Sequence, residues 1–247
     1  MDREERTYVD TDKTYIDADK TYVETNKAQS ESRPQYEERI NLKTFKDFTV
    51  IKELPAIGGE ADAYLIKKSE QLFFLKLYRK DINPKLDVLE KIMEISREIP
   101  EHVVRVYDVG FDNETGRYYE ITEYVKYGNL REAYGNYKIN IDDIVKELAG
   151  AIHNLHKYNI IHRDLKPTNI LVREINPLDL ILIDFGISSA TSEDMSKVLT
   201  TVKGTFQYSA PETFSGYFGK EVDWWSLGMI VYEFLTGSNP FKGLSQQ

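Results

Sequence analysis

Residues 162–169 read His162-Arg163-Asp164-Leu165-Lys166-Pro167-Thr168-Asn169, and this stretch decides the fold. It places a carboxylate, an amine and a carboxamide in one short loop. Two further motifs follow in order, Asp184-Phe185-Gly186 and Ala210-Pro211-Glu212. Transfer of a γ-phosphoryl group needs a carboxylate to orient the attacking hydroxyl, oxygen ligands for Mg²⁺ and a cation on the nucleotide phosphates. The motifs contain groups of each kind, so they favour phosphoryl-transfer chemistry.

Because the motifs occur in the order of the protein-kinase signature, the chain resembles the eukaryotic-type serine/threonine protein kinases from about Phe45 to its last residue. The resemblance implies an α+β bilobal fold. Its small lobe should be a five-stranded antiparallel sheet with one helix, and its large lobe mainly helical. The resemblance also implies ATP and Mg²⁺ as cofactors and serine or threonine hydroxyls of proteins as acceptors. Lys166 before Pro167 is typical of serine/threonine rather than tyrosine kinases.

The composition is consistent with an intracellular enzyme. A chain of 247 residues can bury a large core. The absence of cysteine excludes a disulfide framework and a cysteine-ligated metal site. No apolar stretch approaches the length of a membrane span, and the N-terminus is not a signal peptide. A net charge of -9 argues against nonspecific nucleic-acid binding. We therefore expect a cytoplasmic enzyme with protein substrates and no nucleic-acid partner.

Three regions follow from the change in composition along the chain. Residues 1–44 are polar and are expected to be a disordered tail. Residues 45–125 are expected to form the small lobe and hinge, and residues 126–247 the large lobe. The tail contains a repeat with a period of seven residues: Thr7-Tyr8-Val9-Asp10-Thr11-Asp12-Lys13, Thr14-Tyr15-Ile16-Asp17-Ala18-Asp19-Lys20 and Thr21-Tyr22-Val23-Glu24-Thr25-Asn26-Lys27.

Local patterns predict the main elements. Short β-branched or aromatic runs predict strands at 48–51, 63–66, 72–78, 103–109 and 118–124, with a helix at 84–99 between the third and fourth. Asn140 is expected to cap a helix with an apolar face. Residues 221–236 are apolar nearly all round, which predicts a buried central helix ended by Gly237 and Pro240.

The resemblance assigns roles to individual residues. Asp164 is expected to be the catalytic base, and Lys166 to neutralise the γ-phosphate in transit. Asn169 and Asp184 should hold Mg²⁺ through oxygen ligands, which suits a hard cation. Asp223 should hydrogen-bond the backbone of the catalytic loop. His162 and Phe185 are expected to align the site by packing.

Lys76 is the candidate for the lysine that binds the nucleotide phosphates. An acidic residue on the following helix should pair with it. Glu90 fits this role best, because Met93 then falls where the family has an apolar residue, and Glu94 is the alternative. A snorkelling edge lysine is the other interpretation of Lys76.

The nucleotide site is expected to depart from the family pattern. Ala56, Gly58 and Ala61 stand where the family has three glycines, which loosens the phosphate-covering loop. Phe74 stands where a small residue packs on adenine, and Ala63 where a branched one does. We expect a compensating volume swap, with a partly blocked pocket as the alternative. The expected nucleotide-binding residues are Ile57, Gly58, Ala63, Phe74, Lys76, Thr122 as gatekeeper, Glu123 and Val125 in the hinge, and Leu171.

Regulatory phosphorylation is the next expectation. Arg163 precedes the catalytic Asp164, and in the family this arrangement goes with pairing to a phosphothreonine on the activation segment. Thr200 and Thr201 are nearest the usual position, whereas Thr205 should contact the substrate loop. In the tail, Thr7, Thr14 and Thr21 each precede an acidic residue at a fixed distance. A phosphothreonine in this setting resembles the ligands of forkhead-associated domains, with a solvated linker as the alternative.

The resemblance leaves two questions open. Kinases of this family continue past Pro240-Phe241 with further helices, so we expect the large lobe to be truncated and the sequence to be part of a longer chain. A pseudokinase scaffold with an altered nucleotide pocket is the main alternative to an active enzyme. A small-molecule phosphotransferase of related fold is a weaker one, since Ala210-Pro211-Glu212 serves protein substrates in the family.

Overall fold

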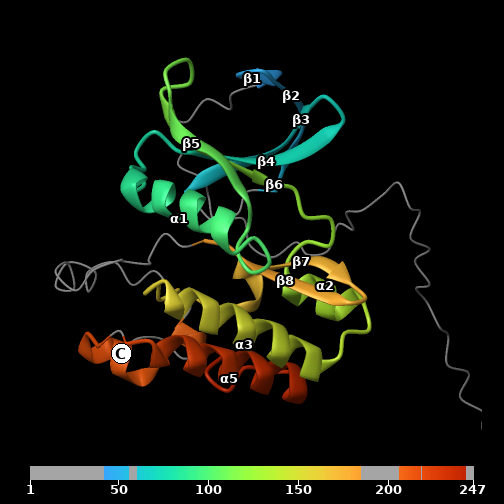
Figure 1. The fold of residues 1–247 in the computed structure, drawn as a ribbon, viewed down its shortest axis with the longest axis vertical. Coiled ribbons are helices and arrows are strands. Elements are labelled where there is room, and N and C mark those ends of the chain that lie inside the picture. The colour runs from blue at the N-terminus through green and yellow to red at the C-terminus, as the bar shows by residue number, and fades with distance from the viewer. Residues whose placement is uncertain (1–41, 56–59, 185–205, 218, 243–247) are drawn as a thin grey trace, which may run out of the picture. The chain divides into compact units, whose positions relative to one another are not determined.

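The computed structural model describes residues 42–55, 60–184, 206–217 and 219–242. A strand-rich part with one helix comes first, and a mainly helical part follows (Figure 1). The compact unit that contains both runs from Leu42 to Gln247, so it begins slightly before the expected boundary at Phe45. The expected tail lies almost wholly outside the described residues. None of the helices in the described ranges combines the length and apolar character that a membrane span requires.

The small lobe contains an antiparallel sheet of six strands in the order β1-β2-β3-β4-β6-β5. The strands are β1 (Thr44–Phe45), β2 (Phe48–Leu54), β3 (Ala61–Lys68), β4 (Gln71–Tyr78), β5 (Val106–Asp112) and β6 (Arg117–Glu123). The sheet has one strand more than predicted. The additional strand, β1, has two residues and forms only by pairing with β2. A segment this short carries no alternation pattern of its own.

Alternate side chains of strand β4 lie on the two faces of this sheet. Phe73, Leu75 and Leu77 are buried in the small-lobe core, together with Phe45, Tyr64, Ile66, Tyr119 and Ile121. Alternate residues of a strand point to opposite faces. Phe74 and Lys76 therefore lie on the other face, where Phe74 packs against Leu54, Ala63 and Leu65. Two predicted nucleotide-binding residues thus share one side of the sheet.

Helix α1 (Leu86–Glu98) joins the small-lobe sheet to the rest of the molecule. Its buried side chains recur at helical spacing, at Leu89, Ile92 and Ile95. Ile92 and Ile95 belong to the same core cluster as Leu148 of the large lobe. The predicted helix at 84–99 is confirmed with slightly shorter ends.

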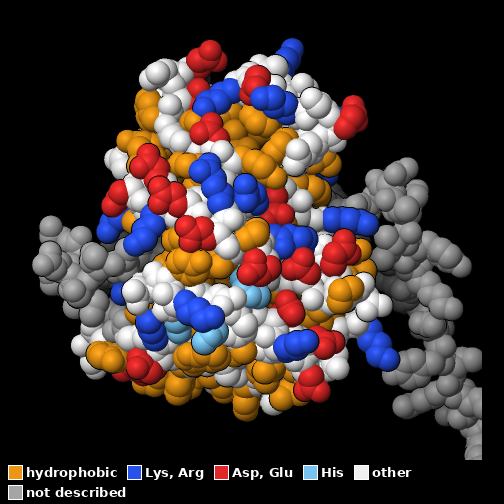
Figure 2. Space-filling model, viewed as in Figure 1, with side chains coloured by type: hydrophobic (Ala, Val, Ile, Leu, Met, Phe, Trp, Pro, Cys, Tyr) orange, Lys and Arg blue, Asp and Glu red, His pale blue; other side chains and the backbone are white. Residues whose placement is uncertain are grey.

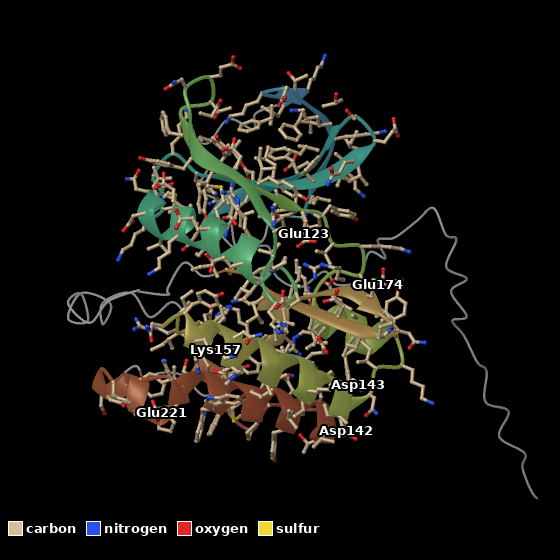
Figure 3. All side chains as sticks on the ribbon, viewed as in Figure 1. Glu123, Asp142, Asp143, Lys157, Glu174 and Glu221 are labelled. Carbon is tan, nitrogen blue, oxygen red and sulfur yellow. The ribbon has the colours of Figure 1, made fainter. Side chains whose placement is uncertain are left out.

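The large lobe contains helices α2 (Leu130–Asn136), α3 (Ile141–Lys157) and α5 (Glu221–Thr236), with short turns η1 (Pro167–Asn169), η3 (Phe206–Tyr208) and η4 (Pro211–Ser215). Asn140 caps α3 as predicted, because its side chain accepts the backbone N–H of Asp142 at 3.1 Å. Asp142 and Asp143 lie at one end of the α3–α5 pair, and Lys157 and Glu221 at the other (Figure 3). The two helices therefore run antiparallel.

Helix α5 has the bounds that the sequence predicts, but its burial differs. It ends at Gly237, whose φ of 78° is left-handed and suits glycine. One side is buried, at Val222, Asp223, Ser226, Leu227, Met229 and Ile230. The other side is exposed among the described residues, at Trp224, Trp225, Tyr232 and Leu235. Hydrophobic side chains accordingly gather along the lower edge of the molecule over α5 (Figure 2). The prediction of a helix buried all round is wrong for this side.

A hairpin of β7 (Ile170–Ile175) and β8 (Leu178–Leu182) lies between the two parts. The backbone of Leu182 exchanges hydrogen bonds with the segment after α1: its N–H donates to His102 at 2.9 Å, and its carbonyl accepts from Val104 at 3.1 Å. The end of β8 is therefore fixed on both sides. Asp184 follows two residues after this end of β8.

Candidate active site

The catalytic loop brings two of the predicted residues, Lys166 and Asn169, to the carboxylate of a third, Asp164. The Lys166 ammonium lies 2.8 Å from Oδ2 of Asp164. The side-chain amide of Asn169 donates both to that oxygen and to the backbone carbonyl of Asp164, at 2.9 Å each. Two side chains therefore bind the Oδ2 atom of Asp164. This confirms that the three side chains form one cluster.

Asp223 holds the backbone of this loop from α5, as predicted. It is fully buried, and its two oxygens accept the N–H groups of His162 at 3.0 Å and Arg163 at 2.9 Å. His156 contributes a third hydrogen bond, at 2.8 Å. Arg163 has a φ of 67°, which few residues other than glycine adopt. Its backbone is thus strained at the residue before Asp164, and the bond to Asp223 stabilises that conformation.

Asp184 is brought to the same place by main-chain contacts. The backbone N–H of Ile183 donates to the carbonyl of Asn169 at 3.0 Å. The ring of His162 hydrogen-bonds the carbonyl of Ile183 at 2.9 Å. His162 is fully buried and aligns the segment before Asp184, which agrees with the packing role predicted for it. Asp184 itself has a φ of 61°, a second strained residue at the site.

Lys76 reaches across from the small lobe to Asp184. Its ammonium lies 2.8 Å from Oδ1 of that carboxylate. Burial is the largest influence on the pKa of Asp184 and would raise it, but the charge and hydrogen bond of Lys76, together with the charges of His162 and Lys166, lower it overall. Burial is likewise the largest influence on the pKa of Lys76 and would lower it, but Asp184, with smaller contributions from Tyr78 and Glu120, raises it overall. Both groups are therefore ionised at neutral pH, and the snorkelling alternative for Lys76 does not hold.

The predicted pair between Lys76 and Glu90 is not formed, and this is a correction. Glu90 and Glu94 are both exposed, and within the described residues neither is paired with Lys76. Helix α1 turns Leu89 and Ile92 inward. The neighbouring Glu90 and Glu94 therefore face away, and Asp184 takes the position of the expected partner.

A residue that the sequence reasoning missed, Glu120, lies beside Lys76. The two are directly opposite each other on β4 and β6, and the hydroxyl of Tyr78 donates to Glu120 at 3.4 Å. Burial raises the pKa of Glu120, although the charge of Lys76 acts to lower it. The available signal was an acidic residue between Tyr119 and Ile121 in an otherwise apolar strand.

The face of the small-lobe sheet that carries Phe74 is apolar around that residue. Phe74 and Tyr124 of the hinge are partly buried and pack against Leu54, Ala63 and Leu65. Thr122 and Val125 are buried at the two ends of the hinge segment. Leu171 is half-buried on β7. In the pairing of β3 with β4, Ala63 lies opposite Lys76 and Leu65 lies opposite Phe74. Ala63 and Phe74, the two residues of the expected volume swap, therefore belong to one cluster but are not paired across the strands.

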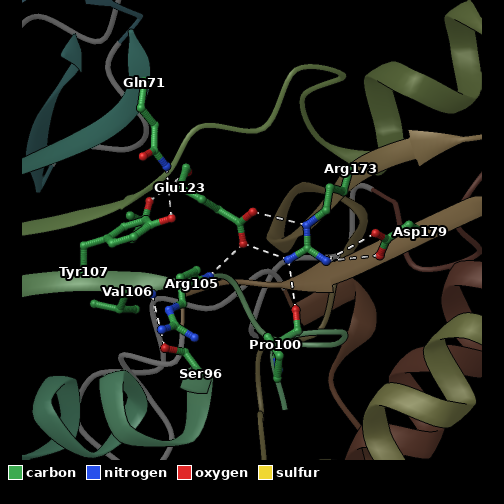
Figure 4. Close-up of polar contacts among 10 residues, drawn as sticks. Gln71, Ser96, Pro100, Arg105, Val106, Tyr107, Glu123, Arg173 and Asp179 are labelled. Atoms are coloured by element: carbon green, nitrogen blue, oxygen red, sulfur yellow. Dashed lines mark hydrogen bonds and ion pairs between the residues drawn. The ribbon is translucent and has the colours of Figure 1, made fainter. Parts of the chain in front are cut away.

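Glu123 uses its side chain for a network that sequence reasoning did not predict (Figure 4). Its carboxylate accepts two hydrogen bonds from Arg173 of β7, at 2.8 and 3.2 Å, and the backbone N–H of Arg105 at 2.8 Å. Arg173 also donates to Asp179 of β8 and to the carbonyl of Pro100, at 3.0 Å for the latter. One guanidinium thus joins the hinge, the hairpin and the end of the α1 segment.

Several predicted residues lie outside the described residues. They are Ile57, Gly58, Phe185, Thr200, Thr201, Thr205 and the tail threonines Thr7, Thr14 and Thr21.

The fold and this site define the class of protein. Residues 57–247 match the model of the protein kinase domain, and the chain belongs to this family. It is 30% identical over 225 residues to serine/threonine-protein kinase RAD53 of Saccharomyces cerevisiae. The aligned region covers 82% of this chain and 27% of that protein. It is 34% identical over 188 residues to calcium/calmodulin-dependent protein kinase type I of Schizosaccharomyces pombe, covering 72% of this chain.

A further similar protein is calcium-dependent protein kinase 4 of Plasmodium falciparum, 34% identical over 151 residues. The chain spans 27% of the length of the first of these relatives, 56% of the second and 28% of the third. They are named as protein kinases, and two of the three names also include calcium.

Proposed function

We propose that this chain transfers the γ-phosphoryl group of ATP to serine or threonine hydroxyls of proteins. The observation that carries the proposal is one constellation: Asp164 with Lys166 and Asn169, beside Asp184 with Lys76. The first group supplies a carboxylate for an attacking hydroxyl, and the second a cation for phosphates. The named serine/threonine kinase among its relatives supports the choice of acceptor.

Each side chain has a defined task in this proposal. Asp164 accepts a hydrogen bond from the substrate hydroxyl and orients it for attack. Lys166 lies within hydrogen-bonding distance of Asp164 and balances charge on the group in transit. Lys76 exchanges its contact with Asp184 for the phosphates. Asp223 keeps the loop backbone in the conformation that places Asp164.

The donor set fits Mg²⁺ held together with a nucleotide. The side-chain NH₂ group of Asn169 donates to Asp164, so the side-chain carbonyl oxygen of Asn169 is the atom that could bind a cation. Asp184 adds a carboxylate with a lowered pKa. Among the described residues, no group of three or more His, Cys, Asp or Glu forms a metal site of its own. Mg²⁺ commonly binds through one or two protein oxygens plus substrate phosphates. The bound cation would neutralise charge on the phosphates.

The apolar cluster around Phe74 is proposed to pack on the adenine ring. Phe74 is only partly buried and belongs to one cluster with Ala63 and with Tyr124 of the hinge. This arrangement favours the volume swap over the blocked pocket. The retained Lys76, Asp164, Asn169 and Asp184 likewise favour an active enzyme over a pseudokinase.

We also propose that the chain phosphorylates itself. Thr200 and Thr201 are the candidates in the activation segment, and Thr7, Thr14 and Thr21 those in the tail. A tethered tail has a high effective concentration at its own active site. Phosphothreonines there would suit a forkhead-associated domain as partner. The repeat in the sequence is the support for this proposal, and mass spectrometry after incubation with ATP and Mg²⁺ tests it.

The main test compares the wild-type chain with Asp164→Asn. Transfer from radiolabelled ATP to a generic protein substrate is measured with and without Mg²⁺, and ATP binding is measured by calorimetry. Asp164→Asn should lower the rate by about 10²-fold or more and leave binding nearly intact, because the carboxylate acts on the hydroxyl. A residual rate within about tenfold of wild type would contradict the assignment of Asp164 as the catalytic base.

A further inference from the structure

Two titratable side chains beside Lys76 have no task in the proposed function. Glu120 lies directly opposite Lys76 in the pairing of β4 with β6, where the Cβ atoms of facing residues are about 4.5–5.5 Å apart. Tyr78 lies two residues after Lys76 on β4 and therefore shares its face of the sheet. Together with Asp184, which contacts Lys76 at 2.8 Å, these residues place two carboxylates and a phenol around one ammonium.

Tyr78 connects Glu120 to the lysine. Its hydroxyl donates to the Glu120 carboxylate at 3.4 Å, and the Lys76 ammonium lies 5.2 Å from the centre of its ring. An ammonium within about 6 Å of a ring centroid is attracted to the face of the ring. Tyr78 is buried, whereas Lys76 and Glu120 are only partly buried. One fixed aromatic side chain thus contacts both the cation and the carboxylate.

Packing of α1 against Tyr78 keeps the acidic residues of this helix away from Lys76. Tyr78 and Leu89 are buried in one apolar cluster. Leu89 belongs to the buried side of α1, and Glu90 and Glu94 are exposed. A rotation of α1 that turned Glu90 inward would expose Leu89 and remove it from this cluster, which the hydrophobic effect opposes. The second carboxylate beside Lys76 therefore comes from β6 rather than from α1.

Asp184 and Glu120 compete for the single ammonium. Burial is the largest influence on the pKa of Glu120 and raises it, the charge of Lys76 lowers it, and the charge of Asp184 raises it further. In the structure Lys76 is paired with Asp184. In the proposed function Asp184 turns to a cation. The negative charge that opposes Glu120 is then compensated, and Glu120 is the remaining carboxylate beside Lys76 among the described residues.

We propose that Glu120 is a positioning residue for Lys76, which takes over the ammonium from Asp184 and holds it toward the nucleotide phosphates during transfer. The inference rests on the phosphoryl transfer proposed above. Glu120 acts through Lys76 and contacts no reacting atom. Its strand is hydrogen-bonded to the strand of the lysine, so the two residues stay opposite each other wherever α1 lies.

A double-mutant cycle in stability tests the interaction without any nucleotide. Urea denaturation at neutral pH compares wild type, Lys76→Met, Glu120→Gln and the double variant. Lys76→Met leaves Glu120 without its cation. Adding Glu120→Gln to that variant should therefore favour folding about tenfold more than adding it to wild type does. Effects that are additive within about twofold show that the two side chains do not interact, and they overturn the proposal.

Steady-state kinetics with ATP, Mg²⁺ and a generic protein substrate test the role in transfer. Glu120→Gln should lower kcat about tenfold and keep the KM for ATP within about twofold of wild type, because Lys76 is present but poorly placed. The variant should not be less stable than wild type at neutral pH, which separates positioning from a merely structural role. An unchanged kcat in Glu120→Gln overturns the proposal even where the stability cycle shows coupling.

Glu90→Gln, on the exposed side of α1, is the matched control. Its stability effect should be additive with that of Lys76→Met, and its kcat should equal that of wild type. A loss of kcat in Glu90→Gln but not in Glu120→Gln would assign the partner of Lys76 to α1 and overturn the proposal. If the wild-type chain transfers no phosphate, the proposed function fails, and the stability cycle still decides whether Glu120 acts on Lys76.

Discussion

The Oδ1 atom of Asp223, on α5, accepts the backbone N–H of Arg163 at 2.9 Å. Arg163 has a φ of 67°, and the same carboxylate binds the N–H of His162. A fully buried side chain of the large lobe thus fixes the backbone that presents Asp164. Asp223 is therefore a positioning residue, because it holds the backbone of the catalytic loop.

Asp223→Asn should lower catalysis and stability together. The two loop N–H groups bind different oxygens of Asp223, and asparagine replaces one of these oxygens with an NH₂ donor, so one buried N–H is left unsatisfied. We expect a loss of about 1–3 kcal/mol in the free energy of unfolding and a fall in kcat with little change in the KM for ATP. Urea denaturation and steady-state kinetics measure the two effects. Asp143→Asn, in the exposed first turn of α3, is the control. Equal kcat for both variants would exclude the positioning role.

Glu120 should make stability depend on pH. Its pKa is raised above the ordinary value of 4.5, chiefly by burial, so its folded form favours the protonated state. The stability associated with the proton is present below pH 4.5 and is lost as the pH rises through the raised folded value. Glutamine does not titrate, so the Glu120→Gln variant does not lose this stability as the pH rises. The variant should therefore gain stability relative to wild type as the pH is raised from 4.5 to neutrality.

Urea midpoints across this pH range provide the measurement. Glu90→Gln is the matched control, because Glu90 is exposed on α1 and should give a flat difference from wild type. The prediction is contradicted if the stability of Glu120→Gln relative to wild type stays constant with pH, or falls as the pH rises.

Arg173→Met should loosen the connection at the hinge. The change removes two hydrogen bonds to Glu123 and one to the carbonyl of Pro100. The partly buried Glu123 carboxylate then keeps only the N–H of Arg105, and we expect a loss of about 1–3 kcal/mol. Hydrogen exchange at the amide of Arg105 should become faster. Lys138→Met, at an exposed lysine, should change neither quantity. Unchanged exchange in Arg173→Met would show that the network contributes no rigidity.

Phe74→Ala tests the volume swap at the nucleotide side. If Phe74 packs on adenine together with Ala63, the smaller side chain leaves a void, and ATP should bind about tenfold more weakly. Calorimetric titration with ATP and Mg²⁺ measures the affinity. Tighter binding would mean that Phe74 obstructs the site and that the blocked-pocket alternative is right.

Much of the fold and the core of the site could be predicted from local patterns. Asn140 as a cap and the bounds of 221–236 follow from residue types within a few positions. The cluster of Asp164, Lys166 and Asn169 lies within one loop, so its geometry follows from a motif. Long-range pairing is different. The two-residue strand β1 forms only by pairing with β2, and no local sequence pattern predicts it.

The errors about partners have the same cause. Glu90 was predicted from its spacing to Met93, but the inward face of α1 is set by packing against the core, and that turns Glu90 outward. The pairing of Arg173 with Glu123 joins residues from different lobes, as does that of Lys76 with Asp184. Such pairs depend on the relative placement of whole elements, which hydrophobic periodicity does not encode.

The contact between Lys76 and Asp184 has a consequence for how the site responds to salt. The two charges cancel each other before any ligand arrives, at a separation of 2.8 Å. A nucleotide that brings its own cation would exchange one internal ion pair for two external ones, a lysine with phosphate and a carboxylate with metal. Before binding, the paired site therefore presents little net charge to the nucleotide. Nucleotide affinity should accordingly vary less with ionic strength than it would at an unpaired lysine, whose charge the salt would screen.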